Sequence, residues 1–152
     1  MIEIRKANVD DVPSLLRLIE AYWIFEHIDG FSAGSLAPQL ERLIDTPSLG
    51  TAWIGFEDSQ AAGYLIAVYV FSVEFMGIVA EFDELFVQAE SRGSGIGTKL
   101  IQTAERECQQ IGCTYVSLQV SRENESARRF YYRNGFQDRS GYELLEKMVA
   151  DA

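Results

Sequence analysis

Residues 85–107 read LFVQAESRGSGIGTKLIQTAERE and contain a strand pattern, a glycine-rich turn and a helix pattern in direct succession. The strand is apolar at Leu85–Val87, and a polar connection, Gln88–Ser91, leads to the turn at Arg92–Gly97. Apolar residues then recur at helical spacing on one face: Ile96, Leu100, Ile101, Ala104, Cys108 and Ile111. The stretch therefore predicts that glycines join the end of a strand to the start of a helix.

This junction is suited to bind a phosphate or pyrophosphate group. The first N–H groups of a helix have no partner within the helix, and they lie at the positive end of its dipole. Glycines in the turn let the backbone come close to a bulky anion, because no Cβ stands in the way. A glycine-rich turn without any ligand is the alternative.

The glycine spacing distinguishes three phosphate-binding patterns. A dinucleotide fingerprint, G-x-G-x-x-G, fails because its last position falls on Thr98. A Walker A loop fails because Thr98 comes before Lys99 instead of after it. The pattern [QR]-x-x-G-x-[GA] is matched by Arg92, Gly95 and Gly97, and it resembles the acyl-CoA pyrophosphate loop of the GNAT superfamily of N-acetyltransferases.

A second motif strengthens this resemblance. Asn124–Phe136 reads NESARRFYYRNGF, which is similar to the later GNAT signature N-x-x-A-x-x-F-Y-x-x-x-G-F at every fixed position. A predicted helix and a predicted strand separate the two motifs, as in the family. The resemblance covers residues 81–136 by motif and the whole chain by the order of its elements.

The patterns predict the element order β-α-α-β-β-β-α-β-α-β-β within a single domain, residues 1–152. The expected strands are 3–6, 51–57, 61–71, 78–87, 114–120, one that begins at Phe136, and 142–149. The nearly all-apolar run at 61–71 is expected to be a central strand covered on both faces. This order resembles the GNAT fold, an α/β (α+β) architecture with a mixed, strongly twisted sheet of about seven strands flanked by four helices.

Composition narrows the class of protein. The 152 residues carry 13 basic and 23 acidic side chains, a net charge of −10, which argues against nucleic-acid binding because phosphates require a basic surface. The same balance is compatible with a cationic amine as partner, and equally with solubility alone. The chain has no apolar run of transmembrane length and no signal-peptide hydrophobic region, so a cytoplasmic protein without a membrane partner is expected.

The sequence predicts neither a metal site nor thiol chemistry. The chain has one histidine, His27, and two cysteines, Cys108 and Cys113, whose spacing matches no metal or redox motif. Cys108 falls on the apolar helix stripe, which is typical of a small core residue. His27 is expected at a helix end.

The GNAT resemblance implies acetyl-coenzyme A (acetyl-CoA) as co-substrate. In the family, the strands before the glycine loop and before the Asn124 helix splay apart, and an extended pantetheine arm pairs with the exposed backbone. Phe86 and Val87 would offer that backbone, and the Val87 N–H would hold the thioester oxygen as in an oxyanion hole. Asn124, which can also cap its helix, would contact the cofactor. The loop residues would bind the pyrophosphate: Arg92, Gly93, Ser94, Gly95, Ile96, Gly97 and Thr98.

The resemblance also makes Tyr131 the proton donor to the coenzyme A sulfur. Tyr131 is the tyrosine of the F-Y-x-x-x-G-F element, and core packing beside Ala127 and Phe130 on one helical face is its alternative role. Tyr132 lies about 100° further round the helix and should face elsewhere. Gly135 fits the left-handed position that follows a helix.

A general base is expected on the strand VAEFDELFV, residues 79–87. Strand alternation puts Glu81 and Asp83 on one face and Glu84 on the other, unless a β-bulge intervenes. Burying three neighbouring acids is costly without a purpose, and their mutual repulsion would raise one pKa towards the working range. Glu81 and Asp83 are favoured as the base. Acids that are solvated, or paired with Arg or Lys, are the alternative.

Together these features predict an N-acetyltransferase that moves the acetyl group of acetyl-CoA to a primary amine by direct attack in a ternary complex. The acceptor is a small cationic metabolite, an antibiotic, or a peptide or protein amino group. Aromatic candidates for an acceptor pocket, none of them assigned, are Tyr22, Trp23, Phe25, Phe31, Tyr69 and Phe75. A non-catalytic acyl-CoA-binding sensor or regulatory domain and a transferase of longer acyl groups are the alternatives. A homodimer is compatible with the family, and no sequence feature decides it.

Overall fold

The computed structural model describes residues 1–151. The chain forms two compact units, Met1–Gln119 and a second that begins at Val120. The first unit contains β1 (Ile2–Lys6), a 3-10 turn (Val9–Asp11), α1 (Val12–Glu26), α2 (Ala33–Asp45), β2 (Gly50–Glu57), β3 (Gln60–Ser72), β4 (Gly77–Val87), a second 3-10 turn (Ala89–Ser91), α3 (Ile96–Gln110) and β5 (Val116–Leu118). The second unit contains α4 (Glu125–Arg133).

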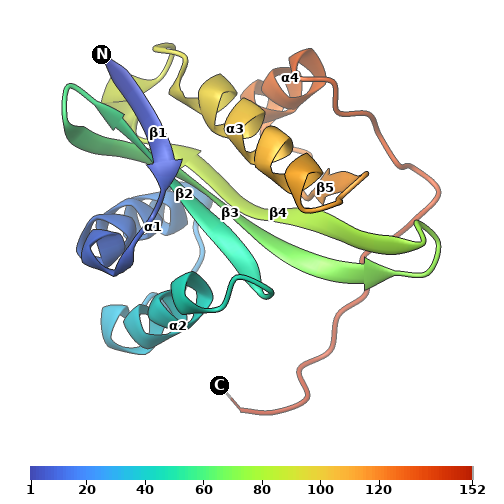
Figure 1. Cartoon of the computed structure of the whole chain (residues 1–152). Coiled ribbons are helices and arrows are strands. Elements are labelled where there is room, and N and C mark those ends of the chain that lie inside the picture. Colours follow the sequence, from blue (N-terminus) through green and yellow to red (C-terminus); the bar gives the residue numbers. More distant parts are fainter. Residues whose placement is uncertain (152) are drawn as a thin grey trace. The chain divides into compact units, whose positions relative to one another are not determined.

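The strands of the first unit form one sheet in the order β1-β2-β3-β4-β5. The first three ladders are antiparallel, and β5 runs parallel to β4. α1 and α2 cover one face of this sheet and α3 covers the other (Figure 1). This is the mixed α/β architecture expected from the sequence. Within residues 1–151, no helix combines the length and the apolar character needed to cross a membrane.

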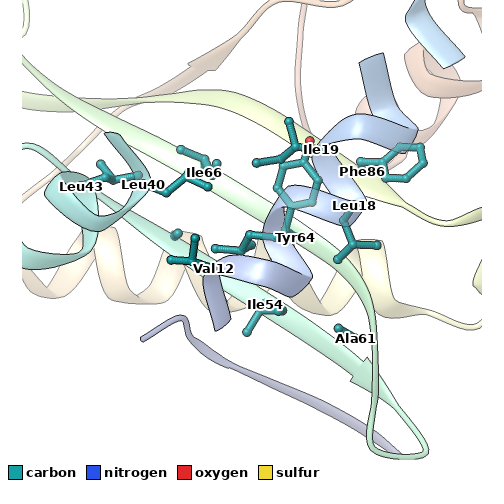
Figure 2. Close-up of a cluster of buried hydrophobic side chains, with 12 residues drawn as sticks. Val12, Leu18, Ile19, Leu40, Leu43, Ile54, Ala61, Tyr64, Ile66 and Phe86 are labelled. Atoms are coloured by element: carbon teal, nitrogen blue, oxygen red, sulfur yellow. The ribbon is translucent and has the colours of Figure 1, made fainter. Parts of the chain in front are cut away.

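The face under α1 and α2 holds a cluster of buried hydrophobic side chains (Figure 2). Leu18 and Ile19 of α1 lie there with Tyr64 of β3. β3 is buried without interruption from Ala61 to Ala67, so its apolar run correctly predicts cover on both faces. Each fully buried large apolar side chain contributes about 1.5–3 kcal/mol to folding. Tyr64 is fully buried as well, so its hydroxyl group requires a hydrogen-bond partner inside the protein.

β4 contains one extra residue, Asp83. In the β3–β4 ladder, Ile66 pairs with Glu84, whereas the next residue, Ala67, pairs with Phe82. Asp83 therefore has no partner on β3, which defines a β-bulge.

The bulge changes which acids share a face. Glu84 stands opposite Ile66, and Glu81 stands opposite Val68, two residues further along β3. Directly paired residues project from the same face, and Ile66 belongs to the cluster under α1 and α2. Glu81 and Glu84 therefore share that face. The grouping of Glu81 with Asp83 by simple alternation is wrong here, because the extra residue intervenes.

The strands expected from Phe136 onwards are not formed. Residues 137–151 are exposed and adopt neither helix nor strand. The apolar residues that suggested a strand at 142–149 are open to solvent, with Tyr142 69% and Leu145 86% exposed. A strand needs a paired neighbour, and an isolated hairpin is marginal in water. Within residues 1–151 the sheet therefore has five strands instead of about seven.

Candidate functional site

The glycine-rich loop presents uncapped backbone N–H groups at the start of α3. Gly93 and Gly95 have positive φ angles, 81° and 98°, which favour glycine, and Gly95 is the N-cap. Within residues 1–151 no side chain caps this helix end, and the Lys99 N–H donates the first intrahelical bond to the Gly95 carbonyl over 3.1 Å. The N–H groups of Ile96–Thr98 precede that bond, so they can receive an anion at the positive end of the helix dipole.

The loop is fixed on its inner side and open on its outer side. The hydroxyl and the N–H of Ser94 donate to the carbonyl of buried Ser91 over 2.5 and 3.3 Å. A Cβ at Gly93 or Gly95 would meet no atom within 4 Å. The loop therefore holds a defined shape and leaves space in front of its glycines.

β4 has an open backbone edge beside this loop. β5 pairs only with Ala80–Phe82, whereas β4 continues to Val87. The Gln88 N–H donates to the Ala62 carbonyl on β3 over 2.9 Å. Because backbone groups alternate along an antiparallel strand, the N–H and C=O of Val87 face away from β3, towards the open edge. Leu85, two residues earlier, faces the same edge.

Phe86 departs from its expected role. It pairs with Tyr64, and the same alternation turns its backbone groups towards β3. Its side chain is buried, and its ring contacts Tyr22 at a centroid distance of 5.6 Å. The expectation that Phe86 offers backbone to a pantetheine arm is therefore revised: the open edge belongs to Leu85 and Val87. Because the direction of the backbone groups alternates along a strand, the sequence could have indicated that Leu85, and not Phe86, faces the same edge as Val87.

Arg92, the first position of the loop motif, folds back onto the strand end. Its Nε donates to the Val87 carbonyl over 3.0 Å. Its guanidinium lies over the rings of Phe25 and Phe86, at 4.8 and 5.5 Å from their centroids. These contacts stabilise the turn between β4 and α3. Of the two outward backbone groups of Val87, Arg92 thus occupies the carbonyl and not the N–H.

Glu84 accepts hydrogen bonds from two neutral donors on the α1 side of the sheet. The Tyr64 hydroxyl donates to Oε1 over 2.8 Å, and the Trp23 Nε1 donates to Oε2 over 3.1 Å. Burial raises the pKa of the Glu84 carboxyl, the two hydrogen bonds oppose that rise, and the charge of Asp83 adds to it. Burial and the neighbouring Glu84 also raise the pKa of the Tyr64 hydroxyl, so Tyr64 remains a proton donor. The sequence gives no sign of this arrangement, which joins three separate elements.

The Trp23 and Tyr64 donors bind Glu84 and not Asp83 or Glu81. Asp83 is exposed as a residue, yet its carboxyl group is crowded by its surroundings and this partial burial raises its pKa. Within residues 1–151, neither carboxylate forms an ion pair with Lys or Arg. Pairing with Arg or Lys is therefore ruled out as the alternative role of Glu81 and Asp83, and solvation remains as the alternative to catalysis.

The second unit carries the later motif on α4. The Asn124 Oδ1 accepts a hydrogen bond from the Ala127 N–H over 3.1 Å, so the predicted helix cap is confirmed. Gly135 follows the helix with φ 90°, as predicted. The Phe136 N–H donates to the Tyr131 carbonyl over 3.1 Å, which closes the last turn.

The two neighbouring tyrosines of α4 have different surroundings. The ring of Tyr131 packs edge-on against Phe136 at a centroid distance of 5.7 Å. The hydroxyl of Tyr132 donates to the Asp138 Oδ1 over 2.6 Å and accepts a bond from Arg128 over 3.4 Å. Tyr132 thus faces elsewhere, as predicted, and its hydroxyl is engaged within the second unit.

The remaining candidate ligands and nucleophiles do not form a site. Within residues 1–151, no group of three or more His, Cys, Asp or Glu is placed to hold a metal ion. His27 ends α1 with φ 57°, in agreement with its predicted position. Cys108 and Cys113 are buried free thiols, and burial raises the pKa of Cys108 to about 12. The Cys108 thiolate is therefore scarce at neutral pH.

A profile of the acetyltransferase (GNAT) family matches residues 13–136, which is most of the chain. The chain belongs to the GNAT family. Its glycine loop, open β4 edge and α4 motif all lie within the residues that this profile matches.

Relatives of this GNAT chain carry N-acetyltransferase names. It is 31% identical over 132 residues to an uncharacterized N-acetyltransferase of Archaeoglobus fulgidus, covering 86% of this chain and 89% of that one. It is 27% identical over 141 residues to the aminoalkylphosphonate N-acetyltransferase of Salmonella typhimurium, covering 88% and 84%. A shorter match, 47% over 68 residues, to an uncharacterized N-acetyltransferase of Methanocaldococcus jannaschii covers 44% of this chain and less than half, 42%, of that relative. The GNAT chain is an acyltransferase.

A solved structure shares the fold of this GNAT chain. A protein of Clostridium acetobutylicum, described as a predicted acetyltransferase and solved with acetyl-CoA, superposes with a TM-score of 0.81. The two chains are 21% identical, and the superposition covers 96% of each.

Proposed function

We propose that this protein transfers the acetyl group of acetyl-CoA to a primary amine by direct attack in a ternary complex. The observation that carries the proposal is the meeting of two features at one strand end. The uncapped N–H groups begin at Ile96, nine residues after Val87 at the open backbone edge. The uncapped N–H groups suit a pyrophosphate, and the open backbone edge suits an extended pantetheine arm with two amides.

The residues of the loop fit this co-substrate. In the proposal the amides from Gly93 to Thr98 hold the pyrophosphate, and the open space in front of the glycines admits it. The edge at Leu85 and Val87 pairs with the pantetheine arm. Arg92 supports the loop through the Val87 carbonyl and leaves the phosphates to the backbone amides. The acetyl-CoA in the Clostridium structure supports the same choice for this chain.

The proposed chemistry needs three groups. The Val87 N–H stabilises the charge that develops on the thioester oxygen when the amine nitrogen attacks the carbonyl carbon. Tyr131 gives a proton to the sulfur that leaves when the C–S bond breaks. Asp83 or Glu81 takes a proton from the amine, directly or through water, because an ammonium has no lone pair to attack with. The raised pKa of Asp83 suits this role better than an ordinary carboxyl would.

The acceptor is proposed to be a small amine. The name of the Salmonella relative gives an aminoalkylphosphonate as its acceptor, which supports a small amine and says nothing in favour of a net positive charge. The net charge of −10 favours a cationic acceptor over an anionic one. A cytoplasmic location stays a prediction, and so do the single domain and the homodimer.

Calorimetric titration with acetyl-CoA, with NADH and ATP as controls, tests the proposal. We expect selective binding of acetyl-CoA at micromolar strength, followed by release of free thiol with a panel of primary amines. Equal binding of all three nucleotides would reduce the loop to a generic anion site. Selective binding without turnover of any amine would favour the non-catalytic sensor instead.

A further inference from the structure

We propose that two copies of this chain associate through the open edge of β3 in the β3–β4 hairpin, so that their sheets join antiparallel across a two-fold axis. The inference does not depend on the proposed acetyl transfer, because the hairpin lies at the end of β4 that is opposite to the glycine loop. It assigns a surface and a partner to an association that the sequence leaves open.

The β3–β4 hairpin extends past the ends of the neighbouring strands β2 and β5 (Figure 1). The β2–β3 ladder ends at Val68, and β5 pairs with β4 only from Ala80 onwards. β3 and β4 continue together to Ser72 and Gly77 as a ribbon of two strands. Within residues 1–151, no further strand pairs with the outer edges of this ribbon. An unpaired edge of this kind is a template for another strand.

The outer edge of β3 presents unused backbone donors and acceptors. The Tyr69 N–H donates to the Leu49 carbonyl over 3.1 Å, which places it on the β2 side of β3. Because backbone groups alternate along a strand, the N–H and C=O of Phe71 face the same side, beyond the end of β2. The Tyr69 carbonyl and the Val73 N–H face that side as well. None of these groups is engaged by a backbone bond in the described part of the chain.

The order of these groups along the edge is self-complementary. In an antiparallel pair centred on Phe71, its N–H and C=O exchange bonds with the C=O and N–H of the partner's Phe71. The Tyr69 carbonyl then stands opposite the partner's Val73 N–H, and the same bond repeats on the other side of the axis. A second copy therefore satisfies every open group of this edge without a change in its backbone.

The side chains of the hairpin are apolar and exposed. Phe71 is 70% exposed, Val73 80% and Met76 90%. Ile78, also exposed, stands directly opposite Phe71 on the ribbon, so the two side chains share a face. A group of exposed apolar side chains marks an interaction site, and Phe and Met are enriched in protein interfaces. Pairing of two hairpins would remove part of this surface from water.

The charges of the hairpin suit a second copy better than a membrane surface. Residues 69–80, YVFSVEFMGIVA, contain one charged side chain, Glu74, and no Lys or Arg. An anionic membrane attracts basic segments, so it is not the favoured partner. Antiparallel pairing puts the two Glu74 residues at opposite ends, roughly 20 Å apart at about 3.4 Å per residue. That separation exceeds the Debye length of about 8 Å at physiological ionic strength, so their repulsion is largely screened.

Sedimentation equilibrium of the full chain over a concentration series tests the proposal. Wild-type protein should show a monomer–dimer equilibrium in the micromolar range. The dimer should be tighter at higher salt, because each copy carries a net charge of −10. Phe71→Glu places two like charges directly opposite each other at the axis, so the dimer dissociation constant should rise by about tenfold or more.

Ile24→Glu is the matched control for Phe71→Glu. Ile24 is also 70% exposed, but it lies on α1 near the opposite end of the sheet from the hairpin. The Ile24→Glu protein should dimerise like wild type.

A second pair of variants separates strand pairing from contact between apolar side chains. Phe71→Ala and Phe71→Pro both lose the ring, and only proline also loses the N–H. That N–H makes no bond in the monomer, and proline is tolerated at such positions of an edge strand. Phe71→Pro should therefore keep the circular dichroism spectrum of wild type and dimerise more weakly than Phe71→Ala. If Phe71→Pro does not fold, Phe71→Glu decides the test alone.

Three results would overturn the proposal. Wild type stays monomeric over the whole concentration series, Phe71→Glu dimerises as tightly as wild type, or folded Phe71→Pro and Phe71→Ala have equal dissociation constants. Leu145→Glu tests the exposed apolar segment near the C-terminus and should dimerise like wild type. Loss of the dimer in Leu145→Glu, with Phe71→Glu unchanged, would assign the association to that segment instead of the hairpin.

Discussion

Glu81 and Glu84 project from the same face of β4, although an odd number of positions separates them. The extra residue Asp83 reverses the alternation between them. The strand therefore presents two acids towards α1 and α2 and keeps a third, Asp83, at the bulge. This arrangement makes it possible to test the three acids separately.

Asp83→Asn should lower turnover with amines most strongly at pH values above the raised pKa of Asp83 and below the pKa of the amine, because there the carboxylate is ionised and the amine arrives as ammonium. General-base contributions are typically about 10²–10⁴-fold. The measurement is kcat/KM against pH for Asp83→Asn and Glu81→Gln. A larger loss in Glu81→Gln would reassign the base, and unchanged profiles in both would mean that solvent accepts the proton.

Gly95→Ala should weaken acetyl-CoA binding by about tenfold. The φ of 98° strains any residue with a Cβ by about 1–2 kcal/mol, and relief of that strain would move the loop amides. Calorimetry with acetyl-CoA measures the loss. Gly112→Ala is the control, because Gly112 has a similar φ of 96° beyond the far end of α3, with no atom within 4 Å of its Cβ position. Equal acetyl-CoA affinities in the two variants would show that the loop does not contribute to cofactor binding.

Tyr131→Phe should lower the rate of acetyl transfer while acetyl-CoA affinity stays near normal, because only the proton for the leaving sulfur is lost. Loss of a positioned general acid costs about 10²–10⁴-fold. Thiol release under saturating acetyl-CoA measures it. Tyr132→Phe removes a neighbouring hydroxyl that is bound to Asp138, and it should keep its turnover. Full turnover of Tyr131→Phe at every pH would refute the proton-donor role.

Glu84→Gln should gain stability relative to wild type as the pH rises from about 4 towards neutrality. Burial holds the folded-state pKa of Glu84 above its ordinary value of 4.5. Between the two values the native state binds more protons than the unfolded state, so the free energy of unfolding of wild type falls as the pH rises. Glutamine does not titrate, so the free energy of unfolding of Glu84→Gln does not fall in this way. Urea unfolding of both proteins at several pH values measures the difference, and a pH-independent difference would contradict the burial argument.

Asp11→Asn should destabilise the fold by about 1–2 kcal/mol at neutral pH. Asp11 accepts two bonds from Arg5, at 2.6 and 2.9 Å, and one from the Asn8 N–H at 2.8 Å. The Arg5 bond lowers the pKa of Asp11, so this stability is present above the ordinary carboxyl value and is lost as the pH falls through the lowered pKa.

The deficit of Asp11→Asn should therefore shrink in strong acid, which urea unfolding would detect. Asp58→Asn, which removes an exposed partner of the N-terminus, is the control and should change stability little. An undiminished deficit of Asp11→Asn at low pH would mean that packing, and not charge, accounts for it.

The amino-acid sequence alone determined the local features of this protein. The glycine spacing predicted the loop, the helical stripe predicted α3, and the apolar run predicted the central strand β3, because each depends on residues close together in the chain. The caps at Asn124 and Gly135 followed from the same short-range rules. The two motifs also pointed to the GNAT family correctly.

The tertiary structure alone decided how distant segments meet. The bulge at Asp83 depends on the register between β3 and β4, and a shift of one residue changes the face of a side chain without changing the sequence pattern. The hydrogen bonds that orient Glu84 come from Trp23 on α1 and Tyr64 on β3. The strands expected beyond Phe136 failed for the same physical reason: a strand pattern becomes a strand only where another backbone edge pairs with it.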